Sequence, residues 1–291
     1  MRRAPIGANV KSAHDMGREF KIVSKLNKFY KETPEVILFC EDDTIIGAPF
    51  YIMKKVEGII LRAKFANKID LNPTKWRQLS EKLVDKLAEL HKLDIETTGL
   101  IELGKPEGYV NRQLEGWIGR YAKSKTEQIA AMETVEMWLL KNQPKTQAQA
   151  FLHNDYKYDN IVFDTELNKI NAILDWEMAT VGDPLMDLGA CLAYWCEKED
   201  GDFLKSMNIT WFEGNFTKKE VVEHYALKTG FDVSNILFYY VFGLYKNAVI
   251  VQQIYARWKA GITSDPRFEN LIFGVKELSD QATNAILKKS I

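Results

Sequence analysis

The chain has 291 residues, of which 46% are hydrophobic and 27% are charged, and its formal net charge is -1. This length allows one large domain or two lobes, and the composition excludes a disordered chain. A charge so close to zero gives no bulk basic field, so we expect no nucleic-acid partner and no attraction to an acidic membrane.

The sequence shows none of the usual signs of export. Residues 1–5 lack the apolar core of a signal peptide, and the longest apolar run, 236–245, is too short to span a bilayer. Cys40, Cys191 and Cys196 form no CxxC pair, and the last two lie on a predicted helix among apolar neighbours. Reduced thiols in a cytoplasmic protein are therefore expected.

The first 57 residues predict a small mixed lobe. Apolar residues recur at helical spacing over 12–28, and Pro34 then stops any helix. Short β-favouring runs follow at 36–39 and 49–53. The predicted order is helix, strand, strand.

After Gly58 the pattern becomes mainly helical, with one pair of short strands at 160–163 and 170–174. Helices are predicted over three stretches before those strands: 73–93, 109–124 and 126–142. We place a lobe boundary near Glu57 and Gly58, which gives lobes of 1–57 and 58–291. The predicted fold class is α+β.

Residues 151–160 carry the clearest chemical signal. His153, Asp155 and Asn160 fit an H-x-D-x-x-x-x-N loop. Asp175 lies at the end of the second predicted strand after this loop, 170–174. Phosphoryl transfer needs a carboxylate that takes the proton of the attacking hydroxyl and oxygen ligands that hold magnesium. Asp155 is the candidate catalytic base, while Asn160 and Asp175 are candidate magnesium ligands. A plain turn of Asp and Asn residues does not account for the downstream Asp175.

Two neighbouring charges allow more than one interpretation. The Lys157 ammonium could contact the transferring phosphoryl group, or it could be a solvated surface lysine. Glu177 follows Asp175 by two residues, so in extended geometry both could face one side. Glu177 could be a further magnesium ligand, an acceptor that hydrogen-bonds the groups around the metal without binding it, or a surface glutamate.

Other polar residues are predicted to have supporting roles. Asp183 precedes Pro184 and should begin a helix, and Asp187 on that helix could accept amide hydrogens from the catalytic loop. His91 on an apolar helix face is expected to be a satisfied core histidine. Lys246 and Arg257 could line an acceptor pocket.

The chain resembles the aminoglycoside phosphotransferase and choline kinase-like family, in the branch that is also found fused to acyl-CoA dehydrogenase domains. Residues 153–160 match the loop of this family, and 174–189 match its metal strand and the following helix. Residues 104–109 and 246–257 also look like this branch. The resemblance implies a two-lobed protein-kinase-like fold and an ATP- and Mg2+-dependent transfer to a hydroxyl of a small molecule.

The resemblance also implies roles for residues of the first lobe. Arg2 matches the basic residue that holds the nucleotide phosphates, and Glu19 matches its helix partner. Arginine in place of lysine keeps the charge but replaces the ammonium by a planar guanidinium with its donors in a fixed arrangement. The connector that would bind adenine through its backbone consists of Met53, Lys54, Lys55 and Val56.

One departure from the family concerns the start of the sequence. Relatives carry two strands and a phosphate-covering loop before the position of Arg2, so these elements are expected to be missing here. Their loss should expose one edge of the first lobe's sheet and weaken ATP binding.

Alternatives to an active kinase therefore stay open. A pseudokinase-like binding protein is one, and a structural partner that pairs through the exposed edge is another, with a monomer or a homodimer as the assembly. The acceptor is undetermined. An aminoglycoside would need a strongly acidic pocket that the sequence does not show, and a hydroxyacyl thioester is suggested only by the fusion partners of relatives.

Overall fold

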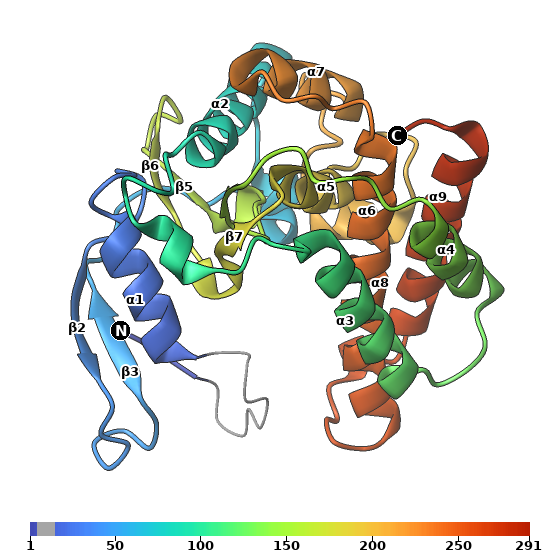
Figure 1. The fold of residues 1–291 in the computed structure, drawn as a ribbon, viewed down its shortest axis with the longest axis horizontal. Coiled ribbons are helices and arrows are strands. Elements are labelled where there is room, and N and C mark those ends of the chain that lie inside the picture. The colour runs from blue at the N-terminus through green and yellow to red at the C-terminus, as the bar shows by residue number, and fades with distance from the viewer. Residues whose placement is uncertain (5–14) are drawn as a thin grey trace.

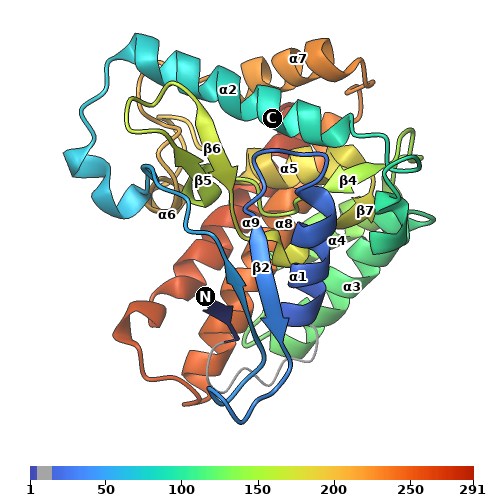
Figure 2. The same cartoon turned by 90° about the vertical axis from the view of Figure 1, so that its left-hand side faces the viewer.

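The computed structural model describes residues 1–4 and 15–291 and has the expected α+β architecture of two lobes (Figure 1). The first lobe contains an antiparallel sheet in the order β1-β3-β2. Its strands are β1 (Arg2–Arg3), β2 (Val36–Cys40) and β3 (Phe50–Met53). Helix α1 (Met16–Leu26) lies beside β2 and β3, as Figure 2 shows from the side of this lobe.

Helix α1 connects the sheet to the second lobe. Its N-cap is Asp15, whose side chain accepts a hydrogen bond from the Arg18 amide; residues 12–14 of the predicted helix lie outside the described residues. Ile22, Val23 and Leu26 at helical spacing are buried in the core. The helix also contacts the short turn Trp176–Met178 of the second lobe, so a helix of the first lobe reaches the segment predicted to bind metal.

Two small antiparallel pairs of strands frame the catalytic segment. Strand β4 (Ala150–Leu152) pairs with β7 (Thr180–Gly182), and β5 (Ile161–Phe163) pairs with β6 (Ile170–Ile173). All three residues of β4 and of β5 are buried. The loop predicted to be catalytic runs between β4 and β5, so a buried strand fixes each of its ends.

Helices form the rest of the second lobe (Figure 1). They are α2 (Pro73–His91), α3 (Tyr109–Ser124), α4 (Ala130–Lys141), α5 (Pro184–Tyr194), α6 (Asp202–Met207), α7 (Lys218–Thr229), α8 (Ile236–Lys259) and α9 (Leu271–Lys288). Helix α8 packs against α3, α5 and α9, and the aromatic run 238–245 on it is buried. No helix in the described part of the chain is long and apolar enough to cross a membrane.

Two details of the sequence prediction are wrong. Cys196 is buried but does not lie on a helix, because α5 ends at Tyr194 and the next residue, Trp195, has extended backbone angles. Helix α4 begins at Ala130 and not near residue 126.

Candidate active site

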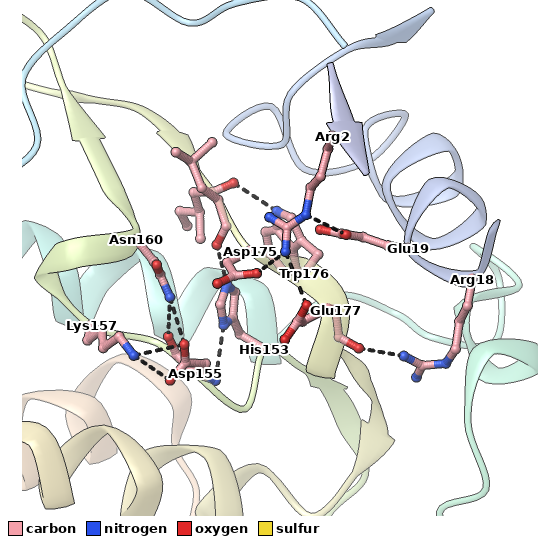
Figure 3. Close-up of polar contacts among 12 residues, drawn as sticks. Arg2, Arg18, Glu19, His153, Asp155, Lys157, Asn160, Asp175, Trp176 and Glu177 are labelled. Atoms are coloured by element: carbon pink, nitrogen blue, oxygen red, sulfur yellow. Dashed lines mark hydrogen bonds and ion pairs between the residues drawn. The ribbon is translucent and has the colours of Figure 1, made fainter. Parts of the chain in front are cut away.

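The loop after β4 brings Asp155, Lys157 and Asn160 into direct contact (Figure 3). The Lys157 Nζ donates to both carboxylate oxygens of Asp155, at 2.8 and 2.9 Å. The Asn160 Nδ2 donates to the Asp155 backbone carbonyl at 2.8 Å and to its Oδ2 at 3.0 Å. The Lys157 side chain is only 21% exposed, so the interpretation as a solvated surface lysine is wrong.

Asp187 on α5 holds the start of this loop. Its carboxylate accepts the amide hydrogens of His153 at 2.6 Å and Asn154 at 2.8 Å, and it lies 3.1 Å from the Nε2 of His91. Burial raises the pKa of Asp187, but the hydrogen bonds from His91 and from the His153 amide help to outweigh burial and hold that pKa below its ordinary value. The other nitrogen of His91 contacts Tyr225. The predicted supporting role of Asp187 and the core role of His91 are confirmed.

His153 stabilises the shape of the loop from inside. Its Nδ1 accepts the Asp155 amide hydrogen at 3.1 Å, and its Nε2 donates to the Leu174 carbonyl at 2.9 Å. Burial lowers the pKa of His153, which fits the neutral ring that these two partners require. Both nitrogens are therefore engaged with the backbone, so His153 fixes the shape of the loop.

The second group of predicted site residues surrounds Asp175. This residue does not end a strand, because β6 stops at Ile173 and Asp175 adopts a left-handed backbone conformation with φ 68°. The turn Trp176–Met178 follows directly, so Asp175 and Glu177 are not in extended geometry either. A tight turn, and not strand alternation, brings both carboxylates to the same cation.

That cation is Arg2 on β1. Its guanidinium lies 2.9 Å from the Glu19 carboxylate and 3.2 Å from that of Glu177, and it also binds Asp175 (Figure 3). The Glu19 side chain is 1% exposed, and this burial raises its pKa to about 7 against the opposing charge of Arg2. The residues that the sequence assigned to phosphate binding and to metal binding thus form one network across the two lobes.

Backbone hydrogen bonds join this network to the catalytic loop. The Leu174 amide donates to the Asn160 carbonyl at 2.8 Å, while the Leu174 carbonyl accepts from His153. The residue before Asp175 is therefore bonded to both ends of the catalytic loop, which fixes Asp175 relative to Asp155.

Sequence reasoning missed Arg18. Its guanidinium donates from α1 to the backbone carbonyls of Glu177 at 2.7 Å and of Ala179. No motif marks this residue, because its partners are main-chain atoms some 160 positions away in the sequence. Its place next to Glu19 on the same helix is the one signal that could have drawn attention to it.

A cavity of about 250 Å³ opens beside the catalytic loop. Lys246 lines it, as predicted, whereas Arg257 is exposed and is not part of its lining. The lining residues are Arg18, Tyr109, Gln113, Trp117, Arg120, Asn154, Glu177, Met178, Thr180, Met186, Phe242 and Lys246.

The connector between the lobes makes local contacts. The Lys54 amide donates to the Glu35 carbonyl at 2.8 Å, and its ammonium lies 2.6 Å from the Glu35 carboxylate. Lys55 pairs with Glu57 at 2.8 Å. Both lysine side chains are exposed.

The oxygen atoms near Asp175 suit magnesium. Within the described residues, no group of three His, Cys, Asp or Glu side chains is placed to hold a metal ion. Mg2+ is usually bound by one or two carboxylates, with waters and substrate phosphates completing its shell. Asn160 uses its Nδ2 toward Asp155, which leaves its carbonyl oxygen as the end that could join the Asp175 carboxylate.

The fold and this loop place the chain among kinase-like phosphotransferases, and comparison with known proteins gives its family. Residues 1–221 match the phosphotransferase enzyme family. The chain therefore belongs to that family. It is also 33% identical to acyl-CoA dehydrogenase family member 10 of Mus musculus over 268 residues, which is 91% of this chain and 25% of the relative. The chain thus spans about a quarter of that relative's length.

Solved structures agree with the fold. A protein of Ralstonia eutropha JMP134 with a provisional assignment as an aminoglycoside phosphotransferase is 26% identical, with a TM-score of 0.83 over 95% of this chain and 85% of that one. A choline/ethanolamine kinase family protein of Mesorhizobium loti has a TM-score of 0.60 at 14% identity, over 93% of this chain and 80% of that one. The second likeness supports the fold alone.

Proposed function

We propose that this chain transfers the γ-phosphoryl group of ATP to a hydroxyl of a small molecule, with Mg2+ as cofactor. The observation that carries the proposal is the contact of Asp155 with both Lys157 and Asn160 in a loop that Asp187 holds from beneath. Membership of the phosphotransferase enzyme family supports the same reaction class.

Asp155 would orient the acceptor hydroxyl and take its proton as the bond to phosphorus forms. Lys157, whose ammonium lies against that carboxylate, would offset negative charge on the transferring group. Because the two side chains already touch, the base and the cation would act on neighbouring atoms of the same reaction centre.

Asn160, Asp175 and Glu177 are the residues that would hold the metal. Bound Mg2+ supplies positive charge that neutralises the nucleotide phosphates. Arg2 would hold the α- and β-phosphates while Glu19 fixes its guanidinium, and the backbone of 53–56 would receive the adenine ring. Arg2 bonds to Asp175 as well as to Glu19, which places the phosphate-binding cation next to the metal-binding carboxylate.

The cavity beside the loop is the proposed place of the acceptor. Three cations line it, Arg18, Arg120 and Lys246, against the single carboxylate of Glu177 among its described lining residues. Glu177 is itself bonded to Arg2. A site of this charge disfavours a polycation, so we infer that the acceptor is neutral or anionic and is not an aminoglycoside.

A screen for ATP consumption tests this function. Neutral polyols, hydroxy acids and aminoglycosides would each be offered with ATP and Mg2+, and ADP formation would be followed. We expect turnover with a neutral or anionic alcohol, and none with the Asp155→Ala chain. Turnover confined to aminoglycosides would contradict the inferred acceptor class, and equal turnover by Asp155→Ala would contradict the proposed base.

A further inference from the structure

The residue before the proposed base has an unusual backbone. Asn154 adopts a left-handed conformation with φ 64°, which costs energy in any residue with a side chain and persists only where surrounding contacts hold it. Its amide donates to Asp187, and its Nδ2 donates to the Met178 carbonyl and the Tyr109 hydroxyl, both at 3.1 Å. The direction of this peptide sets where the Asp155 carboxylate points.

The carbonyl of Asn154 has its own partner, which comes from a distant element. Lys246 on α8 donates its Nζ to this oxygen at 2.6 Å, although the two residues are 92 positions apart. The residue is only 4% exposed, and its ammonium lies 5.9 Å from the Trp117 ring of α3. Helix α8 packs on both α3 and α5, so the ammonium extends from a rigid part of the second lobe.

A buried ammonium in this position is costly for stability. Among the described residues, no carboxylate lies within ion-pair distance of Lys246, and burial lowers its pKa although the nearby charges of Asp155 and Asp187 oppose the effect. The comparison with Lys218 is informative, because that equally buried lysine pairs with Asp200 at 2.6 Å. A buried charge without a salt bridge is poorly explained by folding stability alone.

We propose that Lys246 is a positioning residue of the phosphotransferase site: its ammonium fixes the Asn154 carbonyl and thereby aims the Asp155 carboxylate. The proposal rests on the function proposed above. Four contacts from different elements then hold different parts of Asn154. Asp187 holds the amide from α5, Tyr109 and Met178 hold the side chain, and Lys246 holds the carbonyl from α8.

The first test compares Lys246→Met with the unchanged chain. Methionine keeps the length of the buried stem and removes the ammonium. We expect a Tm that does not fall and an unchanged Kd for ATP with Mg2+, but a fall of about 100-fold in ATP hydrolysis measured as phosphate release, because a misplaced catalytic group can cost that much. Hydrogen exchange of the amides in 153–155, followed by mass spectrometry, should become faster.

The second test restores the lost group. Lys246→Ala lacks Cγ, Cδ, Cε and Nζ, which n-propylamine supplies, so the amine should recover hydrolysis. Propionitrile, which has a similar size but no hydrogen-bond donor, should not. Lys218→Met is the matched control, since it removes another buried ammonium outside the site. We expect it to lower the Tm and to leave the hydrolysis rate of the folded protein unchanged.

Each outcome decides the proposal. Unchanged hydrolysis and unchanged loop exchange in a folded Lys246→Met would overturn it, as would equal recovery with propionitrile. If Lys246→Met does not fold, Lys246→Arg is used instead, because arginine keeps the charge and the hydrogen-bond donors. The amide hydrogens of 153–155 must then exchange slowly in Lys246→Arg. Fast exchange in a folded Lys246→Arg would overturn the proposal. If the unchanged chain neither binds nor hydrolyses ATP, the proposed function fails, while the exchange measurement still decides whether Lys246 holds the loop.

Discussion

The negative charge of the Asp155 carboxylate is required for the proposed transfer, because this group must accept the proton of the acceptor hydroxyl. Asp155→Asn keeps the shape of the side chain but cannot accept a proton, so we expect turnover to fall by a factor on the order of 10² to 10⁴ with an unchanged Tm. Asp159→Asn is the matched control, because this half-buried carboxylate lies in the same loop and lacks a proposed role. ADP formation by the three chains measures the effect, and comparable losses in both variants would argue against Asp155 as the base.

Glu19 should make the stability of the folded chain depend on pH. Burial raises its pKa to about 7 in the folded chain from an ordinary value of 4.5. The folded state therefore binds the proton more tightly than the unfolded state, so the stability from this group is fully present below pH 4.5 and is lost as pH rises through about 7.

Glu19→Gln mimics the protonated form and should remove that dependence. Between pH 5 and pH 8 we expect the free energy of unfolding to fall more in the unchanged chain than in Glu19→Gln, by on the order of 1 to 3 kcal/mol. Urea unfolding of both chains at the two pH values measures the difference. Parallel changes in the two chains would show that Glu19 titrates normally.

At the scale of elements, the close crossing of α5 and α8 supports the site from below. Helix α5 carries Asp187, α8 carries Lys246, and both residues hold the peptide of Asn154. Glycines allow the two helices to approach. A Cβ built on Gly189 of α5 would lie 2.2 Å from the Tyr239 carbonyl oxygen, and one on Gly243 of α8 would lie 2.3 Å from the Gly189 carbonyl oxygen.

A pair of glycine substitutions tests this crossing. Gly189→Ala forces a methyl group against the backbone of α8, so we expect a loss of about 1 to 3 kcal/mol or more in the free energy of unfolding. Gly119→Ala in α3 is the matched control, since a Cβ there meets nothing within 4 Å, and alanine should stabilise that helix by about 0.5 to 1 kcal/mol. Urea unfolding compares them, and equal effects would contradict the close-packed crossing.

Over the whole molecule, local sequence signals predicted helix bounds and the catalytic loop, because these features depend on residues that are close in the sequence. The periodicity of 109–124 gave the bounds of α3, and the Asp183-Pro184 pair gave the start of α5. The H-x-D-x-x-x-x-N spacing predicted that Asp155 and Asn160 belong together, and they are in contact. Turn-forming residues and hydrophobic spacing act over a few positions, so a single sequence is enough to predict the elements that depend on them.

What the sequence did not show depends on contacts between distant segments. Arg18 binds carbonyl oxygens across the two lobes, and main-chain partners leave no pattern of residue types. The contact of Lys246 with Asn154 exists only after α8 has packed on α5. The left-handed turn at Asp175 was also missed, because a short β-favouring run before it resembles a strand that continues.

In the proposed reaction, Asp175 and Asn160 hold a metal-bound nucleotide next to Asp155. Isothermal titration calorimetry of ATP, with and without Mg2+, tests it on the unchanged chain and on Asp175→Asn. We expect Mg2+ to strengthen ATP binding to the unchanged chain and to have little effect on Asp175→Asn, whose side chain has lost its charge. Absence of binding of millimolar ATP with Mg2+ to the unchanged chain, or a full effect of Mg2+ on Asp175→Asn, would rule out this metal-binding role.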